Sequence, residues 1–346
     1  MMQAGFLVAP GHVEVRRVPV PEAGPGEVVV RVRAALTDGT DLKAFRRGHP
    51  QMPMPTRFGH EFSGDVVAVG PGMERFSPGD PIMAVHSAPC GACYWCRANQ
   101  ENLCITVMKT KILGAYAEQL LLPSHIVERN AFVKPAHLSY EAAAFLEPLA
   151  CVVHNVELLA PRSGDMVLVI GAGGFGLLHV VLLRALGARV AIVGRRAERM
   201  RLAKEIGSEW GLEASLDGRT LGEAGKLIDD ITEGRGADRV VECTGQVNGW
   251  NAALALARRG GTVSLFGGPP PGSTVPVDTS RLHYDQISVI SPFHFRPRDV
   301  RRAYELLADG SVDVEPLISD RIPLADLGSA FTRLERGEGV KFAILP

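Results

Sequence analysis

The sequence predicts an α/β protein in which a doubly wound parallel sheet is inserted between two β-rich chain ends. Three observations support this prediction: a β-rich segment up to about residue 135, a regular alternation of apolar strands and helices from about 165 to 290, and a tail of different pattern. Alternating strands and helices favour a parallel sheet, because parallel neighbours need a crossover connection, which is right-handed. At about 150 residues per domain, the 346 residues allow two domains.

β-Branched runs, glycine and proline breaks and helix-capping signals place the individual elements. In the first segment, 28–32 and 66–69 are expected strands between Gly and Pro pairs. Residues 139–159 are expected to be helical, with Ser139 as N-cap, and Pro148 should kink the stretch or divide it into two helices. The alternating segment should contain strands 166–170, 189–193, 239–242, 262–266 and 287–290 and helices 175–186 and 198–206. The tail should contain helices 298–308 and 324–335 and a closing strand, 341–345.

The composition argues against several classes of protein. Thirty-seven Lys and Arg balance 38 Asp and Glu, so no basic excess points to a nucleic-acid partner. No apolar run approaches the roughly 18 residues of a membrane span. Residues 1–8 lack the basic segment and long apolar stretch of a signal peptide. We therefore expect a globular cytoplasmic protein with no membrane partner.

A dinucleotide-binding fingerprint opens the alternating segment. Residues 171–176 read Gly-Ala-Gly-Gly-Phe-Gly, follow an expected strand and begin an expected helix, which is the context that this pattern requires. Gly171 allows the tight turn, Gly173 lets the backbone approach a pyrophosphate, and Gly176 lets the helix pack on the strand. The alternative, a glycine-rich turn in a nucleotide-free domain, fits this context poorly. The predicted cofactor-binding residues here are Gly171, Gly173, Gly174, Phe175 and Gly176.

The end of the second strand of this segment indicates which dinucleotide is bound. An NAD site usually has a carboxylate there, bonded to the ribose 2′-hydroxyl. Here the strand runs into Gly194-Arg195-Arg196, and the next carboxylate is Glu198. Because arginine pairs with a phosphate, we predict a preference for NADP, with NAD possible, and expect Gly194→Asp to move the preference to NAD. The alternative is that both arginines are solvated side chains at a surface turn.

Four cysteines close together predict a structural zinc site. Cys90, Cys93, Cys96 and Cys104 have the spacing C-x2-C-x2-C-x7-C. Four thiolates form a closed tetrahedral site that leaves no position open for a substrate. Cys151 and Cys243 stand alone and are expected to be packed core thiols.

Further metal-ligating residue types occur in three separate places. They are Asp38-Gly39-Thr40-Asp41, Gly59-His60-Glu61 and Glu147-Pro148. Taken alone, each has an ordinary structural explanation: a core histidine, turn residues, or a carboxylate on a helix face. Spacing alone does not bring them into one site.

Together these motifs resemble the zinc-containing medium-chain dehydrogenase/reductase family over essentially the whole chain. The resemblance rests on Gly59-His60-Glu61, the four cysteines, the fingerprint and Glu242-Cys243-Thr244-Gly245, while Glu147-Pro148-Leu149 is similar to the sorbitol and sugar dehydrogenase branch. It implies a GroES-like catalytic domain, 1–150 and 292–346, with a Rossmann domain, 151–291, inserted between. It also implies a homotetramer or homodimer.

The resemblance further implies a catalytic zinc and reversible hydride transfer between NAD(P) and a secondary alcohol, polyol or sugar. The implied metal and catalytic residues are Asp38, Thr40, Asp41, His60, Glu61 and Glu147. Thr40 resembles a proton-relay hydroxyl, and Asp41 resembles the carboxylate that orients His60. Asp38 departs from the family, which has a Cys ligand there. A carboxylate should make the site weaker for zinc and more tolerant of Mn or Mg.

Two alternatives to this enzyme remain at the level of the sequence. The loss of the Cys ligand fits an NADP(H)-binding, redox-responsive module without turnover, although the other ligands are all retained. A zinc-free quinone reductase of the same superfamily would normally lack the cysteine cluster and the Gly-His-Glu ligands. Polar residues such as His49, Arg57 and Tyr116 hint at a hydroxylated substrate without identifying it.

Overall fold

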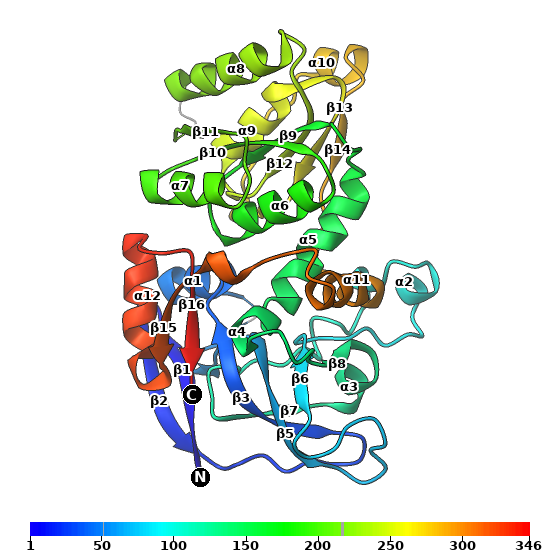
Figure 1. The fold of residues 1–346 in the computed structure, drawn as a ribbon, viewed down its shortest axis with the longest axis vertical. Coiled ribbons are helices and arrows are strands. Elements are labelled where there is room, and N and C mark those ends of the chain that lie inside the picture. The colour runs from blue at the N-terminus through cyan, green and yellow to red at the C-terminus, as the bar shows by residue number, and fades with distance from the viewer. Residues whose placement is uncertain (51, 216–217) are drawn as a thin grey trace. The chain divides into compact units, whose positions relative to one another are not determined.

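The computed structural model describes residues 1–50, 52–215 and 218–346, which divide into two compact units (Figure 1). Unit 1 comprises Met1–Cys151 and Phe295–Pro346, and unit 2 comprises Val152–His294. Unit 1 is therefore built from both ends of the chain. In the sequence, the strand–helix segment lies between these two parts, as the fold class predicted.

Unit 1 consists mainly of antiparallel strands. The last strand of the chain, β16 (Lys341–Leu345), pairs antiparallel with β3 (Val28–Leu36), which in turn pairs antiparallel with β5 (Glu61–Val69). The larger sheet has the order β15-β16-β3-β5-β6-β8, with β7 paired to β3, and the smaller has the order β2-β1-β4. The remaining strands are β1 (Met2–Ala9), β2 (His12–Val18), β4 (Thr56–Arg57), β6 (Pro81–Ala84), β7 (Gln119–Leu122), β8 (Ala131–Val133) and β15 (Ile318–Pro323).

The register of this sheet determines which residues of the two chain ends meet. Leu36 on β3 is opposite Ala343 on one side and Glu61 on the other. The first residue of β16, Lys341, is therefore carried to the start of β5. This pairing connects positions 280 residues apart in the sequence.

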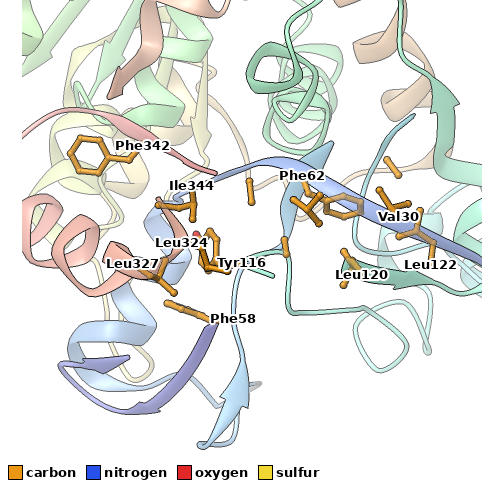
Figure 2. Packing of buried hydrophobic residues seen from close by; sticks show 14 of the residues in the cluster. Val30, Phe58, Phe62, Tyr116, Leu120, Leu122, Leu324, Leu327, Phe342 and Ile344 are labelled. Atoms are coloured by element: carbon orange, nitrogen blue, oxygen red, sulfur yellow. The ribbon is translucent and has the colours of Figure 1, made fainter. Parts of the chain in front are cut away.

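Apolar side chains from both ends of the chain share one core in unit 1 (Figure 2). Phe58 and Phe331 have ring centroids 4.9 Å apart, and Tyr116 packs edge-on against Phe58 at 5.4 Å. All three side chains are fully buried. Burying such side chains contributes about 1.5–3 kcal/mol each, so this core ties the C-terminal segment to the N-terminal strands.

The helical stretch at 139–159 is divided, but the break does not lie at Pro148. Ser139 caps α4 (Tyr140–Ala143) by accepting a hydrogen bond of 2.9 Å from Ala142 N, and α5 (Leu146–Leu159) then follows. Pro148 lies in the first turn of α5, where a backbone N–H has no helical acceptor and proline costs nothing. Residues of α5 after Cys151 belong to unit 2. The other helices of unit 1 are α1 (Gly39–Arg47), α2 (Tyr94–Arg97), α3 (Ser124–Asn130), α11 (Pro297–Ala308) and α12 (Leu327–Arg336), with 3-10 turns at Glu101–Leu103, Glu315–Leu317 and Leu324–Asp326.

Unit 2 contains a six-stranded, all-parallel sheet with the order β11-β10-β9-β12-β13-β14. The chain starts in the middle and builds outwards in both directions, which is the doubly wound Rossmann order. The strands are β9 (Met166–Ile170), β10 (Arg189–Gly194), β11 (Trp210–Glu213), β12 (Ala237–Glu242), β13 (Ala257–Leu265) and β14 (Ser288–Ile290). The helices are α6 (Gly174–Ala185), α7 (Ala197–Glu205), α8 (Gly218–Thr232), α9 (Val247–Leu256) and α10 (Thr279–Tyr284). Among the described helices of the whole chain, none combines the length and apolar character needed to cross a membrane.

Candidate active site

Asp38 stands at the N-cap of α1, directly after β3. Its Oδ2 accepts a hydrogen bond of 2.7 Å from the backbone N–H of Thr40, and the side chain is buried. One role of Asp38 is therefore to cap a helix, which agrees with its structural explanation as a turn residue. The same Oδ2 lies 3.7 Å from His60 Nε2. The carboxylate thus also faces the next predicted ligand.

His60 precedes β5 and is held in place by Asp41. Its Nδ1 lies 3.2 Å from Asp41 Oδ1, and the hydroxyl of Tyr116 donates a hydrogen bond of 2.6 Å to Asp41 Oδ2. In the neutral ring, a proton on Nδ1 directed at Asp41 leaves the lone pair of Nε2 facing Asp38, an arrangement typical of a metal-ligating histidine with a supporting carboxylate. Tyr116 is fully buried, so it supports Asp41 and does not face a substrate.

Glu61 follows His60, but its carboxylate is already engaged. Both of its oxygens accept hydrogen bonds from Lys341 Nζ, at 2.7 and 2.6 Å, and Lys341 also donates to Thr37 O at 3.0 Å. Burial lowers the pKa of Lys341, but Glu61 and Asp38 raise it above its usual range. Lys341 was not among the predicted site residues. A single lysine at the start of an apolar strand belongs to no motif and is more simply explained as the polar end of that strand.

Glu147 lies in the first turn of α5 and contacts a histidine that was not predicted. Its Oε1 lies 3.4 Å from His86 Nδ1 and 3.9 Å from the Sγ of Cys151, one helical turn further on. Cys151 is only half-buried, as is Cys243, which lies 3.7 Å from His179 Nδ1. Burial raises the pKa of both thiols well above its usual range, as expected of packed thiols, although each also borders a polar side chain.

The charges in this region fit a divalent cation. The buried carboxylates Asp38, Asp41, Glu61 and Glu147 are accompanied by two imidazoles, of His60 and His86, and by one ammonium group, of Lys341. Burial lowers the pKa of His60, yet Asp41, Glu147 and Asp38 together raise it to about 10. Burial raises the pKa of Glu147 to about 7. Ligand atoms of Asp38, His60 and Glu61 lie within 4.8 Å of one another, and nitrogen and carboxylate oxygen are ligands that zinc accepts.

The four predicted zinc cysteines are gathered in one loop around α2. All four sulfur atoms lie within 4.8 Å of one another, and the Sγ atoms of Cys93 and Cys96 are 3.5 Å apart, those of Cys90 and Cys96 3.9 Å. A tetrahedral zinc with bonds of about 2.3 Å places its sulfur ligands about 3.8 Å apart. Backbone N–H groups support the cluster, as Cys90 N donates to Cys104 Sγ at 3.3 Å. The chain thus has a four-cysteine site of the structural zinc type.

The two ligand sets should differ in how readily they lose metal. After mild chelator treatment we expect about one zinc per chain to remain and activity to be lost, because four thiolates bind zinc more tightly than a set of carboxylates and one imidazole. Elemental analysis and turnover of the same sample test this. If both sites remain fully occupied after the treatment, the expected difference is wrong.

The glycine fingerprint in unit 2 has the geometry of a dinucleotide turn. Gly171 has φ of +109°, which favours glycine, and a Cβ on Gly176 would lie 1.8 Å from the carbonyl oxygen of Gly171. Gly173 caps α6 and has nothing within 4 Å of where its Cβ would stand. The backbone there is open to an approaching group, and the N-terminus of α6 offers N–H donors to an anion.

Arg195 and Arg196 follow β10 and line a hollow of about 460 Å³ together with Glu213, Ala214 and Ser215. Glu213 Oε1 accepts a hydrogen bond of 3.1 Å from Arg196 N. This carboxylate was not predicted, since it ends β11, a strand without a clear sequence signal. A Cβ on Gly194 would lie 2.8 Å from Ala172 N, so Gly194→Asp should disturb the fingerprint turn. The expected move of the preference to NAD therefore stays a prediction, and this variant would also carry that strain.

The fold and these two ligand sets define a zinc-type, dinucleotide-dependent oxidoreductase, and comparison with known proteins identifies the family. The model of the alcohol dehydrogenase GroES-like domain matches residues 24–130, and that of the zinc-binding dehydrogenases matches residues 174–309. A D-arabitol-phosphate dehydrogenase from Enterococcus avium is 31% identical over 97% of this chain and 95% of its own length. A sorbitol dehydrogenase from Halalkalibacterium halodurans is 29% identical over 97% and 96%.

Solved structures agree with this result. A zinc-binding dehydrogenase from Sinorhizobium meliloti 1021, bound to NADP, has a TM-score of 0.89 and 32% identity, covering 100% of this chain and 99% of that chain. The alcohol dehydrogenase TADH from Thermus sp. ATN1 has a TM-score of 0.89 and 29% identity over 99% of both chains. The chain therefore belongs to the zinc-binding alcohol dehydrogenases of the medium-chain dehydrogenase/reductase family.

Proposed function

We propose that this enzyme oxidises a secondary alcohol of the polyol or sugar class, with a preference for NADP and a catalytic metal held by Asp38, His60 and Glu147. The observation that carries the proposal is the buried contact of His60 with Asp38 on one side and Asp41 on the other. A chain that only bound a dinucleotide would have no need of this costly group of buried charges. Relatives that act on arabitol phosphate and sorbitol support the polyol class.

The side chains at the site divide the work. A metal held there would supply a Lewis acid for the alcohol oxygen, and a bound dinucleotide would supply the hydride acceptor. Asp41 holds the ring of His60 in one orientation. Thr40, whose backbone is fixed by its bond to Asp38, offers a hydroxyl that can pass the substrate proton outwards. Lys341 engages both oxygens of Glu61, so Asp38, His60 and Glu147 are the ligands we propose.

The proposal is tested by a substrate panel of polyols, aldoses and simple alcohols. Each is assayed with NADP and with NAD, with and without added zinc. We expect zinc-dependent turnover of polyols, with NADP the better cofactor. Tight NADP(H) binding without turnover of any substrate would instead support a redox-responsive binding module.

The preference for NADP rests on Arg195 and Arg196 beside the hollow. An arginine bond to a phosphate is charge-assisted and contributes about 1.5–3 kcal/mol, so Arg195→Ala should weaken NADP binding about tenfold or more and leave NAD almost unchanged. Dissociation constants for both cofactors measure this. The exposed Arg201→Ala on α7 removes the same charge away from the hollow and should change neither. A wild-type kcat/KM that is higher with NAD than with NADP would contradict the preference.

A further inference from the structure

Glu213, the last residue of β11, lies beside the end of β10. In the parallel pairing of these two strands, Gly194 is the partner of Glu213. An NAD site usually carries its ribose-binding carboxylate at the end of this second strand, where this chain has Gly194. A Cβ at Gly194 would lie only 2.5 Å from the Cβ of Ala172, so a side chain there requires a shift of the fingerprint turn. A carboxylate is instead present at the same level on the neighbouring strand.

The side chain of Glu213 is directed at the turn that carries the two arginines. Its Oε1 accepts a hydrogen bond of 3.1 Å from the backbone N–H of Arg196, the N-cap of α7. Arg196 has φ of +79°, a conformation that favours glycine, and its own side chain does not cap the helix. The bond from Glu213 therefore supports a turn in an unfavourable conformation. Arg195, Arg196 and Glu213 line the same hollow of about 460 Å³.

The hollow thus combines two positive groups with one negative group. Guanidinium groups attract a phosphate and a carboxylate repels it, whereas a hydroxyl group donates readily to a carboxylate. NADP and NAD differ in this respect, because NADP has a phosphate where NAD has the ribose 2′-hydroxyl. A glutamine could accept the same bond from Arg196 N. Support of the turn alone therefore does not explain the charge of Glu213.

We propose that Glu213 sets how far the enzyme discriminates between the two dinucleotides: its carboxylate opposes the 2′-phosphate of NADP and accepts a hydrogen bond from the 2′-hydroxyl of NAD. This inference rests on the proposed function, because it places the adenosine ribose beside Arg195 and Arg196. The arginines attract NADP, while Glu213 reduces that preference and keeps NAD as a second cofactor. Because Glu213 is exposed, water and salt screen its charge, and its effects are moderate.

The test compares the dissociation constants of NADP and NAD for the wild type and for Glu213→Gln, which keeps an acceptor for Arg196 N but removes the charge. NADP should bind about threefold more tightly and NAD about threefold more weakly, so the ratio of the two constants should change about tenfold. NADP binding to the variant should also weaken more steeply with rising salt, because one repulsive charge is gone. A general loss of stability would not move the two cofactors in opposite directions.

Two further variants serve as controls. Glu205→Gln on α7 removes an exposed carboxylate that does not line the hollow, and it should change neither constant. Glu213→Ala removes the acceptor as well as the charge, so it should weaken NAD binding at least as much as Glu213→Gln does. Equal changes for both cofactors, or NAD binding that neither Glu213 variant weakens, would overturn the inference.

Arg195→Ala, measured in the same series, separates this inference from the proposed cofactor preference. If Arg195→Ala leaves NADP binding unchanged, the proposed preference is contradicted and the role of Glu213 falls with it. If Arg195→Ala weakens NADP binding but Glu213→Gln changes neither cofactor, the proposed preference stands and the role of Glu213 alone is overturned.

Discussion

Asp38→Ala is expected to abolish turnover and to empty the catalytic metal site, while the zinc of the four-cysteine site remains. The carboxylate of Asp38 faces His60 Nε2 at 3.7 Å, and alanine offers no ligand atom. Metal content per chain and kcat with a polyol measure both effects. An active Asp38→Ala enzyme with unchanged metal content would show that Asp38 only caps α1.

Because Asp38 also caps a helix, the variant needs a matched control. Asparagine is as good an N-cap as aspartate, so Asp38→Asn should keep the bond to Thr40 N but bind metal weakly. Loss of the cap alone costs about 1 kcal/mol, which leaves a folded enzyme. Asp38→Cys should restore a softer ligand, tighten zinc binding and reduce tolerance for Mn. If Asp38→Asn retains full metal content and turnover, the carboxylate is not a ligand.

The parts of the fold with strong local signals were predictable. β9 consists of five fully buried apolar residues, and both this strand and the fingerprint that follows it lie where the sequence predicts them. β11 (Trp210–Glu213) was missed because it is a short edge strand of alternating exposure that contains a glycine. A kink or division of the helix was predicted at Pro148, but the division precedes α5 and Pro148 lies in the first turn of that helix, where proline is tolerated.

The residues of the candidate site could be predicted only where a sequence motif identified them. Cys90 and the other three thiols are close in sequence, so spacing alone indicated their site. Lys341 and His86 carry no motif, and only the pairing of distant strands brings Lys341 to Glu61. His86, which follows β6, and Glu147, in α5, also meet across 61 positions of the chain. Such contacts follow from topology and register, which no local pattern encodes.

Lys341→Met is expected to destabilise unit 1 strongly. The ammonium group is bonded to both oxygens of Glu61, and both side chains are buried, with exposures of 2% and 0%. Breaking a buried ion pair by removing one partner typically costs about 3–5 kcal/mol, because the remaining charge has no compensation. The free energy of unfolding from urea titration, compared with that of the wild type, measures this loss.

The double variant Lys341→Met with Glu61→Gln tests whether the loss comes from the pair itself. Removing the second charge should restore much of the stability, since replacing a whole buried ion pair is often close to neutral. Together with the single variant Glu61→Gln, the two variants complete a double-mutant cycle that gives the coupling energy. Lys341 lies at the start of a strand that packs against the common core, so a defect of packing would persist in the double variant. A double variant as unstable as Lys341→Met would therefore assign the effect to the strand and not to Glu61. A single variant within about 1 kcal/mol of the wild type would contradict the role of Lys341 as the partner of Glu61.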